Sequence, residues 1–482
     1  MKDLGENPTP AARVAMAGEI EPRGAWQLMA LPRSERAVYI WLSVWTLVYL
    51  VYHATMGPEP LHFSHIELGR HLLFGDPIVA PAHPMFGYAI IIAALGPWTL
   101  LFNAAIGWIG FVLAYRWLGL GRMPASLVLY AAIVAYAGMI SSWNDHAPWL
   151  GLVMLSLAFF QRYGDRGPIA GLAVGLLWGM AYNIRSEALL LFPLYLATQA
   201  GLEAFGYAPR RFKCHAAALA TFLMCMVPWA IYTTSVLGKY TPGTTHSWSV
   251  AYYSLGLVPN NPYNIVTQDE WIADRAAEFG EPSPWTERSN EHFQKEFVQL
   301  IASDPVFFMK KMVWGVYTFV RFGPYVPNLK LLAGNQPADQ MRVRLAFRDL
   351  ASTLHIPRFM WSASMQALPA PSPSPTSVIE GMLAAISHLI EKSLMLACLV
   401  ALAQTAWLML RPATVLHLGA PLTYAVSTIA LTLFVSAVFL PTTRMSTVPF
   451  VFSAVLLQAL RCDRKQRSGS PRYAAGQPSA AE

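Results

Sequence analysis

The feature that most constrains this chain is a succession of long apolar segments separated by short turns that carry arginine or lysine. The first is 37–55, and others follow at 98–118, 124–141, 147–161, 168–184, 188–202, 214–237, 388–410, 414–440 and 446–461. A helix of about 20 apolar residues crosses the hydrocarbon core of a bilayer. The pattern therefore predicts an all-α integral membrane protein with about ten transmembrane helices.

The composition favours a bilayer as the surrounding solvent. Hydrophobic residues make up 55% of the 482 residues and charged residues 13%, whereas soluble domains contain about 25% charged residues. The formal net charge of +7 does not predict nucleic-acid binding, because the basic residues stand beside the apolar segments. That placement is typical of residues that orient a chain in a membrane.

The same basic residues predict the orientation. Arg13, Arg23, Arg33 and Arg36 precede the first segment, and the last segment ends at a cluster that includes Arg461 and Arg464. Because cytoplasmic turns are enriched in arginine and lysine, we expect both termini in the cytoplasm. The predicted localisation is a multi-pass protein of a bacterial inner membrane.

Five parts of the chain follow from this topology. They are a cytoplasmic tail (1–36), an N-terminal transmembrane module (37–237), an extracytoplasmic segment with a Pro/Ser linker at 366–377 (238–387), C-terminal transmembrane helices (388–461) and a basic cytoplasmic tail (462–482). The first extracytoplasmic loop, 56–97, predicts two interfacial helices, Leu61–Phe74 and Met85–Leu95. Nearly all the polar residues outside the tails fall on the extracytoplasmic face, where we expect the function to reside.

Several short motifs on that face resemble one class of membrane enzymes. Residues 66–97 read IELGRHLLFGDPIVAPAHPMFGYAIIIAALGP; Asn144-Asp145 precedes a span, Arg185-Ser186-Glu187 precedes LLLFP, and Arg444 precedes Pro449. Their order is similar to that of the GT-C glycosyltransferases, in particular bacterial members related to the protein mannosyltransferases and the lipid A aminoarabinose transferases. Together the motifs touch the first half of the chain and its last spans.

This resemblance implies transfer of a sugar from a polyprenyl-phosphate donor to an extracytoplasmic acceptor, which is a lipid, a polysaccharide or a protein. Such a reaction needs a carboxylate that accepts the proton of the acceptor hydroxyl. It also needs a cation that stabilises the leaving phosphate. No cofactor is required by this scheme, and a requirement for a divalent cation stays open.

Three carboxylates are candidates for the catalytic role. Family members carry an Asp shortly before the first surface helix, where this chain instead has Glu59, within Gly-Pro-Glu-Pro. Glu59 is the predicted base; Glu67, on the helix itself, is the alternative, and a solvated loop charge is the structural interpretation of either. Asp145 is the second predicted acid, and its structural interpretation is an N-terminal helix cap, which either Asn144 or Asp145 would provide.

Two arginines are the candidates for binding the donor phosphate. Arg185 and Arg444 both stand at extracytoplasmic ends of apolar segments, and a guanidinium donates to two phosphate oxygens at once. Their structural interpretations are an ion pair between Arg185 and Glu187, and snorkelling of either side chain toward the interface.

The aromatic segment after the seventh apolar run is a candidate acceptor platform. The predicted acceptor-binding residues are His246, Trp248, Tyr252 and Asp269, and the alternative is an aromatic belt at the membrane interface. The histidines of the first loop, among them His62, His65 and His83, suggest a metal site, but interfacial histidines are common without a metal. We predict no metal site.

Two other classes of protein share these features. One is a non-catalytic subunit, channel or transporter of a polysaccharide export system, although charges near the middle of the apolar segments are nearly absent and a transport path needs such groups. The other is a polymerase or ligase of lipid-linked oligosaccharides, which the sequence alone separates poorly from a glycosyltransferase.

Overall fold

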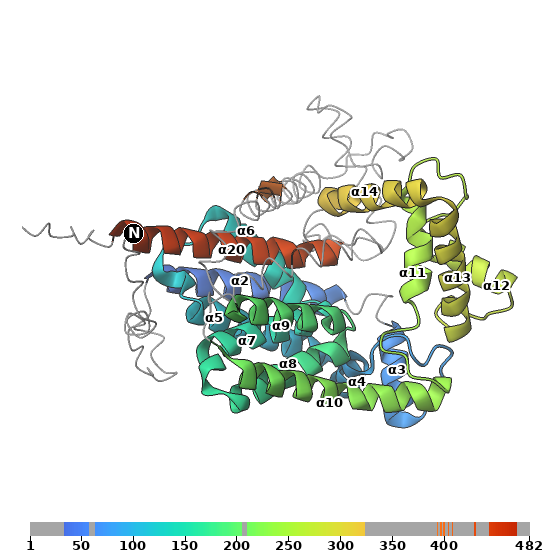
Figure 1. The fold of residues 1–482 in the computed structure, drawn as a ribbon, viewed down its shortest axis with the longest axis horizontal. Coiled ribbons are helices and arrows are strands. Elements are labelled where there is room, and N and C mark those ends of the chain that lie inside the picture. Colours follow the sequence, from blue (N-terminus) through green and yellow to red (C-terminus); the bar gives the residue numbers. More distant parts are fainter. Residues whose placement is uncertain are drawn as a thin grey trace, which may run out of the picture.

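The computed structural model describes residues 33–56, 63–204, 210–322 and 443–469, together with a few single positions between 393 and 429. These residues are helical and contain no strand (Figure 1). Within these described ranges, three stretches are long and apolar enough to cross a membrane, namely Arg33–Ala54, Phe86–Trp117 and Phe212–Leu237. The prediction of an all-α membrane protein is thus confirmed in its coarse form, whereas ten crossings are not.

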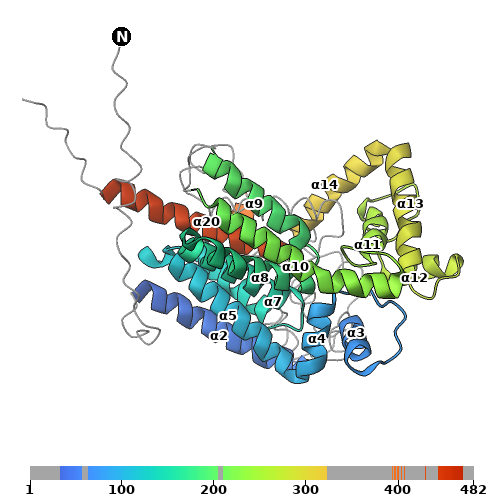
Figure 2. The same ribbon diagram turned by 60° about the horizontal axis from the view of Figure 1, so that its bottom comes forward.

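Most of the helices run side by side in one bundle (Figures 1 and 2). The bundle contains α2 (Arg33–Met56), α5 (Thr99–Trp117), α6 (Leu127–Ile140), α7 (His146–Tyr163), α8 (Pro168–Ile184), α9 (Ala188–Ala204), α10 (Phe212–Leu237) and α20 (Thr443–Gly469). The most extensive packing joins α8 to α10 and α5 to α7. Large apolar side chains on the outer faces of α2 and α10, such as Ile40, Leu47 and Met224, are exposed, as expected of helices that face lipid.

Glycines lie at the two most extensive helix contacts of the bundle. A Cβ atom added at Gly151 of α7 would lie 2.8 Å from the backbone nitrogen of Gly107 in α5. On α8, Gly171 and Gly175 lie against backbone atoms of α10, at Cys214 and Ala218. Small residues at such positions let helix backbones approach closely, which is a common basis of packing between membrane helices.

The two helices of the first loop lie together at one end of the bundle (Figure 2). The first, α3 (Phe63–Phe74), agrees with the predicted Leu61–Phe74. The second, α4 (Phe86–Leu95), agrees with the predicted Met85–Leu95: it ends at Gly96, whose φ of 53° leaves the helical region, and the short η3 turn (Gly96–Trp98) leads to α5. Pro97 lies in the first turn of η3, where its missing N–H is not needed.

A smaller helical unit follows α10 at the same end of the bundle (Figure 1). It comprises α11 (Ser247–Tyr253), η6 (Ser254–Leu257), α12 (Asp269–Glu278) and α13 (Glu287–Ser303), and then α14 (Pro305–Phe322) leads back to contact α20. The unit has its own apolar core, which includes Tyr252, Ile272 and Phe293. The predicted helix Ser283–Ile301 is α13; the Pro/Ser linker lies outside the described residues.

Candidate functional site

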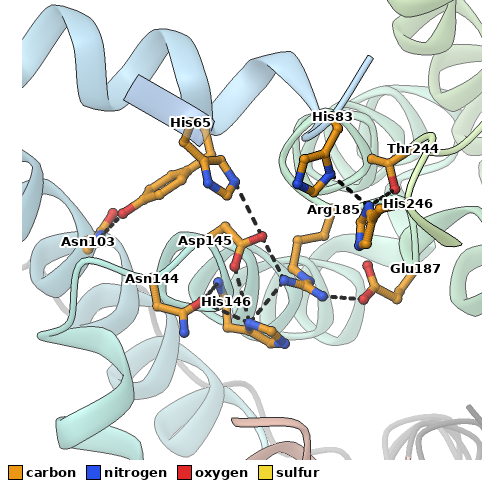
Figure 3. A network of polar contacts seen from close by, with 11 residues as sticks. His65, His83, Asn103, Asn144, Asp145, His146, Arg185, Glu187, Thr244 and His246 are labelled. Atoms are coloured by element: carbon orange, nitrogen blue, oxygen red, sulfur yellow. Dashed lines mark hydrogen bonds and ion pairs between the residues drawn. The ribbon is translucent and has the colours of Figure 1, made fainter. Parts of the chain in front are cut away.

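Polar side chains from four separate turns meet where the bundle joins the first loop and the smaller helical unit (Figure 3). Asp145 and His146 come from the turn between α6 and α7, and Arg185 and Glu187 from the turn between α8 and α9. The first loop contributes His65 and His83, and the residues just before α11 contribute Thr244 and His246. The turn between α6 and α7 and the turn between α8 and α9 are two helices apart, so the alternating direction of the helices brings both turns to the same end of the bundle.

Arg185 stands at the centre of this cluster and bridges two carboxylates. Its Nη1 lies 2.6 Å from Oδ2 of Asp145, and its Nη2 donates to Oε1 of Glu187. Nη1 also lies 3.0 Å from Nδ1 of His146. Within the part of the chain that the structure describes, Nε of Arg185 has no acceptor within hydrogen-bonding distance, so this donor remains for a ligand.

Asp145 is engaged through both of its carboxylate oxygens. Oδ1 lies 3.2 Å from Nδ1 of His146, and Oδ2 lies 3.7 Å from Nε2 of His65 in addition to its contact with Arg185. Burial favours a raised pKa for Asp145, but the charge of Arg185 and the neighbouring imidazoles of His146 and His65 hold that pKa well below its ordinary value. Asp145 is therefore an anion at neutral pH.

Of the two residues that the helix-capping interpretation allowed, Asn144 and not Asp145 bonds the start of α7. The side chain of Asp145 makes no capping hydrogen bond to α7. Instead Oδ1 of Asn144 accepts a hydrogen bond of 2.9 Å from the backbone N–H of His146. Asn144 thus satisfies a free donor at the helix N-terminus, which leaves the carboxylate of Asp145 free to turn toward Arg185.

Buried contacts of Tyr88 and Asn103 hold the first loop against the turn that carries Asp145. The ring of Tyr88 in α4 lies edge-on against His65, and its hydroxyl accepts a hydrogen bond of 3.1 Å from Asn103 in α5. Asn103 also donates to the backbone oxygen of Ser142 at 2.9 Å. Because these groups are buried and bonded, they fix the position of α3 and α4 relative to the Asp145 turn.

A pair of histidines joins the first loop to the smaller helical unit. Nδ1 of His83 lies 3.0 Å from Nδ1 of His246, and the hydroxyl of Thr244 lies 2.7 Å from the same atom of His246. The ring of His83 also stacks on Trp285. Burial lowers the pKa of His246 to about 4, and burial with the neighbouring imidazoles His246 and His65 lowers that of His83. Both rings are therefore neutral at pH 7.

The predicted base is not among the residues that meet here. Glu59 lies outside the described residues, so its role stays a prediction. Glu67 is exposed on α3, whereas His65 and Leu68 are buried. Arg444 is the second residue of α20, and its side chain lies outside the described part. Of the predicted catalytic and phosphate-binding residues, the structure brings together Asp145 and Arg185.

The predicted acceptor platform is divided between two places. His246 belongs to the cluster around Arg185 (Figure 3). Tyr252 is instead buried in the core of the smaller unit, where its ring stacks on Trp271 and Phe293, and Trp248 packs against the same core. Asp269 is the first residue of α12. A role for these residues in acceptor binding stays a prediction.

Glu187, His65 and His146 are members of the cluster that the sequence alone did not mark as site residues. The sequence indicated Glu187 as a possible ion-pair partner of Arg185, and His65 was one of several histidines in the first loop. The signal that would have identified them is their position in the sequence, since His146 and Glu187 each lie within two residues of a helix end that was predicted to be extracytoplasmic, and His65 lies on α3 of the first loop. No group of three or more metal-ligating side chains occurs among the described residues.

Comparison with protein-family models, with curated proteins and with solved structures gives no match for this chain. The similarity to the GT-C class therefore depends on the sequence motifs alone.

Proposed function

We propose that this protein is a membrane glycosyltransferase that moves a sugar from a polyprenyl-phosphate donor to an extracytoplasmic acceptor. A carboxylate takes the proton of the acceptor hydroxyl, and Arg185, with Arg444 as the second predicted cation, stabilises the phosphate that leaves. The acceptor is a lipid, a polysaccharide or a protein. In this proposal the chain crosses a bacterial inner membrane about ten times, and both termini lie in the cytoplasm.

The observation that carries the proposal is the position of Arg185. Its guanidinium is 15% exposed, it is held by two carboxylates, and it lies where an apolar bundle ends. A polyprenyl-phosphate places its phosphate at that level of the membrane, because the lipid chain stays in the hydrocarbon and the phosphate does not. Charged groups at such a depth are costly and are kept where a function needs them.

The carboxylates beside Arg185 could remove the proton from the acceptor hydroxyl. Inverting transfer requires a base close to the cation that holds the leaving phosphate. Asp145 and Glu187 both contact Arg185, so base and phosphate ligand would share one site. A non-catalytic subunit would not require carboxylates and a cation in this arrangement.

The experiment is transfer by the purified full chain in nanodiscs, with a panel of polyprenyl-phosphates that carry radiolabelled hexoses or pentoses. Lipid and polysaccharide extracts serve as acceptors, and release of sugar to water is followed in parallel. Arg185→Lys should lower transfer by about 100-fold or more, because lysine cannot replace the planar contacts.

A matched ion pair at the opposite end of α7 provides the control. Nε of Arg211 lies 2.6 Å from Oδ1 of Asp165, and Asp165 belongs to the turn that follows α7. Asp165→Asn and Arg211→Lys should leave transfer unchanged. Wild-type protein that neither transfers nor hydrolyses any donor, and that binds none of them, would refute the proposed function and favour a transporter or assembly subunit.

A further inference from the structure

The cluster around Arg185 contains one more carboxylate than its ion pairing needs. One buried guanidinium is neutralised by one carboxylate, yet Asp145 and Glu187 both contact Arg185, and the neighbouring imidazoles of His83 and His246 are neutral. Arg185 thus has two carboxylate partners where one would neutralise it, so the second carboxylate is available for a use other than charge compensation.

The two carboxylates differ in how many partners they have. Both oxygens of Asp145 have partners, Oδ1 with His146 and Oδ2 with Arg185 and His65. Glu187 contacts Arg185 through Oε1, and its carboxylate also accepts a hydrogen bond from its own backbone N–H. Within the described ranges Glu187 forms no ion pair besides that with Arg185, so more of its acceptor capacity is left for a ligand than in Asp145.

The two carboxylates also differ in access. The side chain of Glu187 is 27% exposed, compared with 14% for Asp145. Asp145 lies between His65, His146 and Arg185, whereas Glu187 lies on the side of the cluster that faces His246 (Figure 3). An acceptor hydroxyl can therefore reach Glu187 without displacing any of the side chains that hold Arg185.

We propose that Glu187 is the catalytic base of the transfer reaction and that Asp145 is a positioning residue for Arg185. This assignment rests on the proposed function, and it replaces Glu59 in that role. The substrate group that Glu187 contacts is a hydroxyl of the acceptor, presented between Glu187 and the donor sugar.

The carboxylate of Glu187 takes the proton of the acceptor hydroxyl while the acceptor oxygen forms a bond to the anomeric carbon of the sugar. The bond between that carbon and the phosphate oxygen breaks, and its electron pair stays on the polyprenyl phosphate, whose added negative charge is stabilised by Arg185. Glu187 later releases the proton to solvent, with neutral His246 beside it as an available acceptor.

The test compares donor binding with turnover in the full-length protein. Glu187→Gln keeps the size of the side chain and an oxygen for Arg185 but cannot take up a proton at neutral pH. Transfer, and release of sugar to water, should fall by about 100-fold or more, whereas retention of a radiolabelled polyprenyl-phosphate sugar by the nanodiscs should stay within about twofold. Arg185→Lys should weaken that retention, which separates phosphate binding from proton transfer.

Glu278→Gln is the matched control, since Glu278 forms an ion pair with Arg275 on the exposed face of α12, far in sequence from the cluster. Glu278→Gln should change neither the rate of transfer nor the retention of the donor. Transfer that persists in Glu187→Gln and is lost in Glu59→Gln would overturn the assignment of Glu187 while the glycosyltransferase function stands. No transfer, hydrolysis or donor retention in the wild-type protein would overturn the proposed function, and with it this assignment.

Discussion

Nη1 of Arg185 lies 2.6 Å from Oδ2 of Asp145 across 40 residues of chain. The contact joins the turn between α6 and α7 to the turn between α8 and α9, so it fixes the ends of four helices at one level. The same pair orients the guanidinium that we propose as the phosphate ligand. Structure and function therefore depend on one ion pair.

We expect Asp145→Asn to destabilise the protein. The substitution removes one of the two negative charges that compensate a buried guanidinium, and the loss of such a partner costs about 1–3 kcal/mol. The measurement is the thermal unfolding temperature in detergent. Asp165→Asn is the control, because Asp165 is 71% exposed in its ion pair with Arg211 and exposed pairs contribute at most about 1 kcal/mol. Equal unfolding temperatures for the two variants would contradict the structural role of Asp145.

Stability should decrease when the pH is lowered from about 6.5 toward 4. Burial lowers the pKa of His246 to about 4 and also lowers that of His83, whereas an unfolded histidine titrates near 6.5. Between these values the unfolded state binds more protons, so acid favours unfolding by up to about 1.4 kcal/mol per pH unit for each histidine. Charges on Glu187, Arg185 and Asp145 act on His246 as well.

The variant that tests this origin is His246→Asn, which should reduce the pH dependence of the unfolding temperature without abolishing it, since His83 remains. His292→Asn is the control, because the His292 side chain is 39% exposed in the smaller helical unit. If the unfolding temperature changes with pH equally in wild type and in His246→Asn, another group causes the acid sensitivity.

Gly151→Ala should destabilise the bundle by about 1–3 kcal/mol. The added methyl group would meet backbone atoms of α5 at 2.8 Å, and backbone atoms cannot move aside as a flexible side chain does. Gly201→Ala in α9 is the matched control: an added Cβ there has no atom within 4 Å, so alanine should stabilise the helix by about 0.5–1 kcal/mol. Unfolding temperatures that shift in the same direction would argue against the close crossing of α5 and α7.

The orientation in the membrane can be tested with single cysteines. Glu278→Cys, on the exposed face of α12, should react with a membrane-impermeant maleimide added to intact cells. Arg166→Cys, in the turn after α7, should react only after the membrane is permeabilised. Of the native cysteines, Cys214 and Cys462 are buried, which keeps their background labelling low. Labelling of Arg166→Cys in intact cells would reverse the predicted topology.

Several elements could be predicted from the sequence because their signals are local. Apolar runs of membrane length indicated the bundle helices, and the turns at Asn144-Asp145 and Arg185-Ser186-Glu187 lie where the apolar periodicity stops. The helix Met85–Leu95 and its end before the next span were also predicted, because Gly96-Pro97 is a helix-breaking pair and α4 ends at Gly96 with a positive φ. The number of crossings was not confirmed, since three stretches of the described residues are long and apolar enough to span a membrane.

An apolar helical protein with polar turns at the helix ends could be predicted from the sequence, because hydrophobic length and charge position act along the chain. The pairing of the polar groups depends instead on the packing of the helices. The contacts of Arg185 with Asp145 and of His83 with His246 join residues that are 40 and 163 positions apart. No local sequence pattern indicates such pairs, because they depend on how helices pack across glycine contacts. For the same reason the greater exposure of Glu187 compared with Asp145 is a property of the tertiary structure.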